Sequence, residues 1–69
     1  MHGHLAGALR ERIEQMVLEG EIEAGARINE LRLAAPLRVS RGPVREALRG
    51  LERAGLLVAV PNRGMFVRK

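Results

Sequence analysis

One stretch of the chain, residues 39–51, limits what the sequence can fold into more than any other. Its apolar residues recur at intervals of three, four and seven positions: Val44, Ala47, Leu48 and Leu51. This spacing predicts a helix with one buried face. Ser40 is expected to be the N-cap of that helix, because a serine hydroxyl accepts a hydrogen bond from an unpaired backbone N–H there. Pro43 falls in the first turn, where a missing N–H costs little.

Three arginines lie along a different side of the same predicted helix, at Arg41, Arg45 and Arg49. The major groove of DNA is wide enough to admit a helix, and an arginine can bond phosphates as well as the edge of guanine. We therefore interpret residues 40–54, approximately, as a recognition helix that lies in the major groove. The remainder of the chain is then its support.

The composition sets bounds on that support. The 69 residues allow one small domain, and its core must be aliphatic because Phe66 is the only aromatic residue. The net charge of +4, from 12 Lys and Arg against 8 Asp and Glu, favours a polyanionic partner. With no cysteine and only two histidines, neither an enzyme nor a cofactor is expected. No apolar run reaches the ~20 residues of a membrane span, and we expect a cytoplasmic protein.

The N-terminal part of the chain reads as a helix that packs against the rest. Apolar residues four positions apart predict it over residues 5–19: Leu5, Leu9, Ile13 and Val17. Gly20 is expected to stop it. Residues 1–4 are expected to be a disordered end. A metal pair formed by His2 and His4 is the less favoured alternative.

The middle of the chain is predicted to hold a short second helix. Arg27 and Ile28 read as a very short strand, after which Asn29 can cap a helix over residues 30–35. Pro36 removes a backbone donor and disfavours helical geometry before it, so the helix is expected to end or distort there. The turn into the recognition helix follows directly.

The C-terminal part is predicted to be a β-hairpin. Residues 56–60 and 65–67 read as strands, and residues 61–64 between them are dense in turn formers. Arg63 lies at the tip, where it can reach the DNA backbone or the minor groove. A surface charge without function is the alternative. The whole order predicts a mainly α domain with a small β-hairpin, a winged helix-turn-helix of three helices plus a two- to three-stranded wing.

Three motifs within this order are specific: R-I-N-E at residues 27–30, V-S-R-G-P-V-R-E-A-L at residues 39–48 and P-N-R-G at residues 61–64. Together they closely resemble the N-terminal domain of the gluconate-repressor (GntR) family, most of all its FadR-like branch, in which the partner domain is all-helical. The resemblance covers roughly Leu5 to Val67. It places one winged helix-turn-helix domain at residues 5–69.

The resemblance implies a bacterial, metabolite-responsive transcription regulator, commonly a repressor, that binds palindromic operators of double-stranded DNA as a homodimer. In the family a larger C-terminal domain makes the dimer and binds a small organic acid or similar metabolite, sometimes with a metal. That domain is absent from this chain, and no cofactor is expected in the domain that is present.

The resemblance also assigns residues to the DNA contact. Ser40 and Arg41 open the recognition helix and would contact phosphate and base. Arg45 would read a base edge, namely guanine through two parallel hydrogen bonds. Gly42 holds a position whose side chain often touches DNA in the family, and as glycine it can offer only its backbone. Glu46 is expected to orient a neighbouring arginine, since a carboxylate facing a phosphate is repelled.

The tip of the wing, which would contact DNA next to the recognition helix, corresponds to Asn62, Arg63 and Gly64. Arg32 and Arg49 are weaker candidates for phosphate contacts. Two positions depart from the family pattern. Arg38 holds a turn position that is usually glycine, where a left-handed backbone is wanted, and Pro36 two residues earlier is unusual. These two departures leave the geometry of the turn open.

A protein-interaction module without DNA binding is the alternative function, because winged helices also serve that purpose and a fold does not determine a function. Such a module has no need for Arg41, Arg45 and Arg63 to converge on one surface. The three arginines therefore favour sequence-specific DNA binding.

Overall fold

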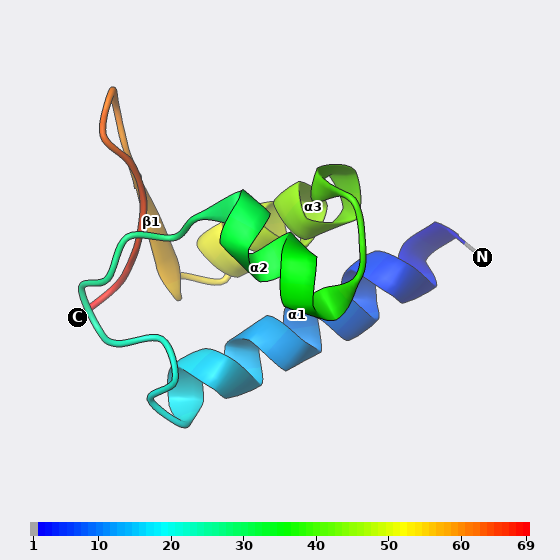
Figure 1. Cartoon of the computed structure of the whole chain (residues 1–69). Coiled ribbons are helices and arrows are strands. Elements are labelled where there is room, and N and C mark those ends of the chain that lie inside the picture. Colours follow the sequence, from blue (N-terminus) through cyan, green and yellow to red (C-terminus); the bar gives the residue numbers. More distant parts are fainter. Residues whose placement is uncertain (1) are drawn as a thin grey trace.

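The computed structural model describes residues 2–69, and side chains from Leu5 onward. Its elements are, in chain order, α1 (His2–Leu18), α2 (Glu30–Leu37), α3 (Arg41–Arg53), β1 (Leu57–Val60) and β2 (Gly64–Val67). The three helices pack together, and the antiparallel β1–β2 hairpin projects beyond them (Figure 1). This is the winged helix-turn-helix order that the sequence predicts.

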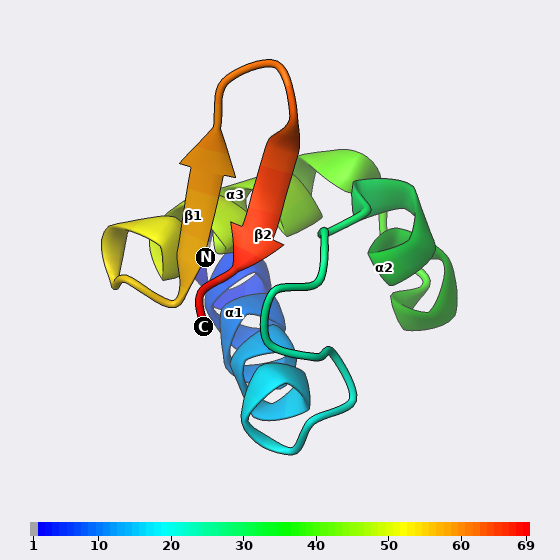
Figure 2. The ribbon, with the colours of Figure 1, turned by 90° about the vertical axis from the view of Figure 1, so that its left-hand side faces the viewer.

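An aliphatic core joins the helices to the hairpin. The largest fully buried side chains come from α1, α3 and β1: Ile13, Val44, Leu48, Leu51 and Leu57. Helix α3 packs against α1, α2 and β1, so it is the central element of the fold. Figure 2 shows α3 passing behind the hairpin with α1 below both. The predicted buried face of the recognition helix is therefore confirmed.

Helix α1 begins earlier than the sequence indicates. It starts at His2 rather than at Leu5, so the backbone of residues 2–4, expected to be disordered, is helical. No capping residue or proline stands before Leu5 to start the helix there. Met1 and the side chains of His2 and His4 lie outside the described residues, as does the suggested metal pair. Gly20 follows the end of the helix as predicted.

Helix α2 runs through Pro36 to Leu37, two residues past its predicted end. The helix thus does not end at Pro36, where the sequence predicts an end or a distortion. Pro36 lies in the last turn, so its missing N–H removes one bond, to the carbonyl of Arg32, from a helix that ends one residue later. The start is as predicted, because the side chain of Asn29 accepts a hydrogen bond from the backbone N–H of Arg32 at 3.1 Å.

Arg38 closes α2 in the left-handed conformation, with φ 57° and ψ 42°. Its N–H donates to the carbonyl of Ala35 at 3.2 Å, and the N–H of Val39 donates to that of Ala34 at 3.3 Å. These two bonds form a Schellman motif, which requires a left-handed residue at this position. Arg38 therefore carries about 1–2 kcal/mol of strain that a glycine would avoid.

Replacing Arg38 with glycine is expected to leave the stability unchanged or to raise it by up to about 1 kcal/mol. Glycine relieves the strain, although its greater freedom in the unfolded chain offsets part of the gain. The midpoint of urea unfolding measures the difference. Arg38→Ala, which removes the side chain but keeps the strain, is the control and should gain nothing. A clear loss in the glycine variant would mean that the Arg38 side chain is held by a stabilising partner.

The wing is a two-stranded sheet with a short addition at one edge. Gly55, with φ 89°, turns the chain from α3 into β1, as predicted. In the register of the hairpin, Leu57 lies opposite Val67, and both are buried against the helices. The short strand predicted at residues 27–28 is reduced to a single bridge, which pairs Arg27 with Phe66 of β2. The segment before α2 is thereby attached to the wing.

Candidate nucleic-acid interface

Helix α3 presents two different faces. The inner face is buried in the core, and the outer face carries three exposed arginines: Arg41, Arg45 and Arg49. Arg41 and Arg49 are about 12 Å apart along the helix, at 1.5 Å of rise per residue. The row of arginines is therefore long enough to follow a groove for several base pairs.

The start of α3 leaves its hydrogen-bonding groups free. Ser40 has the extended backbone of an N-cap, with φ −80° and ψ 169°, but its side chain makes no capping bond. Ser40 is thus the N-cap as predicted, but the expected hydrogen bond from its hydroxyl is absent, and Pro43 removes one of the two possible donors. A capping hydroxyl accepts from the second or third N–H of the helix, and the third residue here is Pro43, which has none. Exposed Ser40 therefore keeps its hydroxyl for another partner.

Gly42, the second residue of α3, is exposed, and a Cβ added there would meet no protein atom within 4 Å. The protein itself therefore does not require a glycine at this position. What Gly42 offers outward is a bare backbone with room in front of it, which agrees with the expectation that it contributes backbone only. The first backbone N–H groups of a helix favour anions in this setting.

Arg45 is held by an acidic residue of α2. Its Nε donates to Oε2 of Glu30 and its Nη2 donates to Oε1, both at 3.2 Å. The side chain of Arg45 is 49% exposed and that of Glu30 is 30% exposed. The hydrogen bonds to Glu30, and secondly its negative charge, raise the pKa of Arg45 above its ordinary value. Arg45 is a fixed cation that is oriented from outside its own helix.

The carboxylate that orients an arginine was expected to be Glu46, and this expectation is wrong. Among the described residues, Glu46 takes part in no salt bridge, and Glu30 performs that task for Arg45. Glu46 follows Arg45 directly in the helix, and neighbouring helical residues point in different directions. Glu30 reaches Arg45 because the start of α2 lies against α3.

The tip of the wing is a tight turn. Asn62 has φ 63°, and the N–H of Arg63 donates to the carbonyl of Val60 at 3.0 Å. Pro61 and a left-handed Asn62 in the two central positions are the pattern of a type II turn. The side chains of Asn62 and Arg63 are both exposed. The predicted hairpin tip is confirmed.

Arg27, in the segment before α2, supports this turn through a hydrogen bond. Its Nε donates to the carbonyl of Arg63 at 3.1 Å, across 36 residues of sequence. Gly64 has φ 116°, and a Cβ added there would lie 3.0 Å from the same Nε. Gly64 therefore lets Arg27 approach the turn, in addition to adopting a backbone conformation that other residues avoid. A glycine at position 64 is therefore required by the structure of the wing itself, independently of any contact with DNA.

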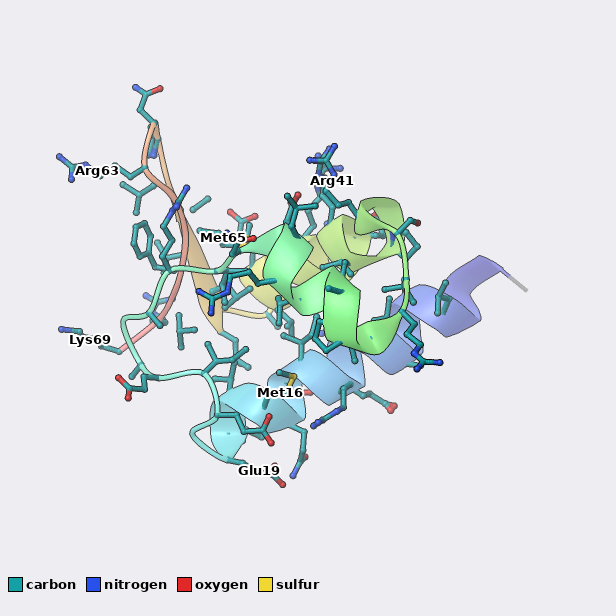
Figure 3. The ribbon with its side chains drawn as sticks, viewed as in Figure 1. Met16, Glu19, Arg41, Arg63, Met65 and Lys69 are labelled. Carbon is teal, nitrogen blue, oxygen red and sulfur yellow. The ribbon has the colours of Figure 1, made fainter. Side chains whose placement is uncertain are left out.

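The start of α3 and the start of β2 in the wing face a common hollow of about 300 Å³. Arg41 and Gly64 both line it, together with Arg27 and Glu30. In Figure 3, Arg41 projects from α3 on the side toward which the wing extends, and Arg63 projects outward from the wing itself. The structure therefore brings the helix start, the Arg45–Glu30 pair and the wing to one side of the molecule.

Two of the predicted site residues stand apart from this group. Arg32 lines a different hollow, beside Glu21 and Glu23 of the α1–α2 connection. Arg49 is exposed on the outer face of α3, two turns beyond Arg41. Their role as the weaker candidates for phosphate contacts stays a prediction.

The sequence pattern missed two residues of this surface, Arg27 and Glu30. The sequence placed Arg27 in a short strand and Glu30 at the start of a helix, and both in the R-I-N-E motif, without a partner for either. A local signal could not have shown their partners, which lie 36 and 15 residues away. Within residues 2–69 no helix is long and apolar enough to cross a membrane. Among the side chains that the structure describes, from Leu5 onward, no three or more groups form a cluster able to bind a metal.

Comparison with known proteins gives a consistent result. Residues 5–67 match the family model described as bacterial regulatory proteins, gntR family. The Nta operon transcriptional regulator of Aminobacter aminovorans is 47% identical over 53 residues, which are 77% of this chain and 25% of that protein. A probable D-xylose utilization operon transcriptional repressor of Paenarthrobacter nicotinovorans is 37% identical over 65 residues, 94% of this chain and 29% of that protein.

Solved structures agree with the fold. A GntR family transcriptional regulator from Pseudomonas syringae matches with a TM-score of 0.81 at 35% identity, covering 97% of this chain and 29% of that one. A GntR protein of Streptococcus agalactiae also matches with a TM-score of 0.81, at 31% identity, covering 93% of this chain and 31% of that one. The chain thus spans about a quarter to a third of the length of the proteins it matches.

Proposed function

The chain belongs to the gntR family of bacterial regulatory proteins, and from this we propose that it is the part of a transcription regulator that binds double-stranded DNA in a sequence-specific manner. The family and its named relatives are regulators of transcription rather than enzymes. The observation that carries the proposal is the shared side of α3 and the wing. There Arg41, Glu30 and Gly64 line one hollow, and Glu30 holds Arg45 through two hydrogen bonds.

Each part of this surface has a proposed task. Helix α3 lies in the major groove, where Arg45 reads a guanine edge and Arg41 contacts base and phosphate. Ser40, whose hydroxyl is free of a cap bond, donates to a phosphate, and Gly42 lets its backbone approach closely. The wing reaches the adjacent groove or backbone through Asn62, Arg63 and Gly64. Arg32 and Arg49 contribute phosphate contacts further out.

The whole protein is proposed to repress genes of metabolism in the bacterial cytoplasm, in response to a metabolite. One relative is named as a repressor of a D-xylose utilization operon, which supports this direction. A homodimer on a palindromic operator is part of the proposal, with the dimer made by a domain outside this chain. The matches name the family and not the FadR-like branch, so that assignment stays a prediction.

The proposal is tested by the salt dependence of DNA binding. The chain is expected to bind weakly, because a single domain lacks the second, linked contact of a dimer. Each phosphate neutralised lowers the logarithm of the association constant by about 0.9 per logarithm of salt concentration. Arg32, Arg41, Arg49 and Arg63 together therefore predict a slope of about −3 to −4. The probe is a fluorescent duplex selected by the chain from a randomised pool, titrated at several salt concentrations.

Variants of single arginines provide the control for this titration. Arg41→Gln and Arg63→Gln should each make the slope shallower by about 1. Arg12→Gln is the control, because it removes an arginine of α1. Helix α1 and the wing tip lie on opposite sides of α3 (Figure 1), so this variant should leave the slope unchanged. Binding that does not respond to salt would contradict a contact driven by arginine. No detectable binding to any duplex would favour a protein-interaction module instead.

A further inference from the structure

The pair between Glu30 and Arg45 joins the two helices of the helix-turn-helix. Glu30 is the first residue of α2, and Arg45 lies one turn into α3. Both oxygens of the carboxylate accept hydrogen bonds, one from Nε and one from Nη2 of the guanidinium, at 3.2 Å each. This bidentate geometry restricts the guanidinium plane as well as its position.

The pair uses only one edge of the guanidinium. Arginine has five N–H donors, and Glu30 takes the one on Nε and one of the two on Nη2. Three donors remain: both on Nη1 and the second on Nη2. The edge formed by Nη1 and Nη2 is the one that can donate two parallel bonds to O6 and N7 of guanine. Arg45 can therefore bind a base without leaving Glu30.

Stability does not explain the pair. Both side chains are substantially exposed, and exposed ion pairs contribute little to folding because water screens them. Glu30 also places a negative charge next to a surface proposed to meet phosphates, where it repels them. A carboxylate in this place weakens general attraction to DNA. What it provides is a fixed orientation of Arg45.

We propose that Glu30 is a positioning residue for base reading, which holds Arg45 in the orientation that discriminates between sequences while lowering the affinity for DNA in general. The inference rests on the proposed function and deepens it. Since Arg45 is already ordered in the free protein, less side-chain freedom is lost on binding the correct base. Glu30 thus affects the ratio of the affinities for correct and incorrect DNA sequences more than the affinity for DNA in general.

The test compares Glu30→Gln with the unmodified chain on two duplexes at one fixed salt concentration. One duplex is selected from a randomised pool by the unmodified chain, and the other is its scrambled form. The ratio of the two affinities is expected to fall by about two- to tenfold, the effect of ordering one flexible side chain. Affinity for the scrambled duplex should stay equal or increase, because a negative charge is lost. A purely structural role would weaken both together.

Three further variants sharpen the comparison. Glu46→Gln removes the same charge from the neighbouring position of α3 without touching Arg45, and its ratio should stay as in the unmodified chain. Glu30→Asp keeps the charge on a shorter arm and should also lower the ratio. In an Arg45→Ala background, Glu30→Gln should change the ratio no further. Thermal unfolding confirms that each variant is folded.

The outcomes separate this inference from the function on which it rests. A ratio that Glu30→Gln leaves unchanged, while Arg45→Ala lowers it, would overturn the positioning role alone. Tighter binding of both duplexes with an equal or higher ratio would overturn it as well, and would make Glu30 a restraint that DNA must displace. If the unmodified chain enriches no sequence from the pool, the proposed function fails and the role of Glu30 fails with it.

Discussion

Replacing Leu51 with alanine is expected to lower the free energy of unfolding by about 2–5 kcal/mol, the usual cost of removing a fully buried leucine. Leu51 has 0% of its side chain exposed and lies on the inner face of α3, which packs against α1, α2 and β1. A domain of this length has a stability of only about 3–10 kcal/mol. The variant should therefore lose a large part of the domain's stability and unfold at a clearly lower urea concentration.

Urea unfolding followed by circular dichroism measures this change. Leu31→Ala is the matched control, because Leu31 is 61% exposed and its loss should alter the stability by no more than about 0.5 kcal/mol. A cost below about 1 kcal/mol at Leu51 would show that α3 is not the centre of the core. Such a result would also mean that the packing of the inner face of α3 does not hold the arginines of its outer face in place.

Arg45→Ala is expected to reduce the preference for the selected duplex over its scrambled form by about 1–3 kcal/mol, which corresponds to roughly five- to 150-fold. Arg45 lies on the outer face of α3 and keeps one edge of its guanidinium free for a base. Losing a bidentate base contact affects the correct sequence far more than others. The measurement is the affinity for both duplexes at one salt concentration.

Arg63→Ala provides the contrast. Arg63 lies on the exposed turn of the wing, where a contact with the backbone or the narrow groove carries little sequence information. Its loss should weaken both duplexes by similar factors and leave their ratio nearly unchanged. If Arg45→Ala instead lowers both affinities equally, then Arg45 is a phosphate contact, and the assignment of base reading to this side of α3 is wrong.

Local sequence chemistry was sufficient to predict most of the fold. The three- and four-residue spacing of Val44, Ala47, Leu48 and Leu51 predicts a helix with a buried face, since helical periodicity is a property of neighbouring residues. The hairpin followed from turn formers between two short apolar runs. A left-handed backbone at position 38 was indicated only through resemblance to a family, and with arginine there the sequence left the geometry of the turn open. Even the missing cap bond at Ser40 has a local contribution, because Pro43 lacks one of the two N–H groups from which the hydroxyl could accept.

The sequence alone, then, determined the helices, their buried faces and the wing, because these depend on residues a few positions apart. Only the tertiary structure decided which charges meet. Glu30 pairs with Arg45, and Arg27 supports the turn at Arg63, because α2 lies against α3 and the wing folds back on the segment before α2. Helical and strand propensities carry no information about such distant partners. The sequence could thus predict which arginines lie on the proposed DNA-binding surface, but not the orientation of Arg45.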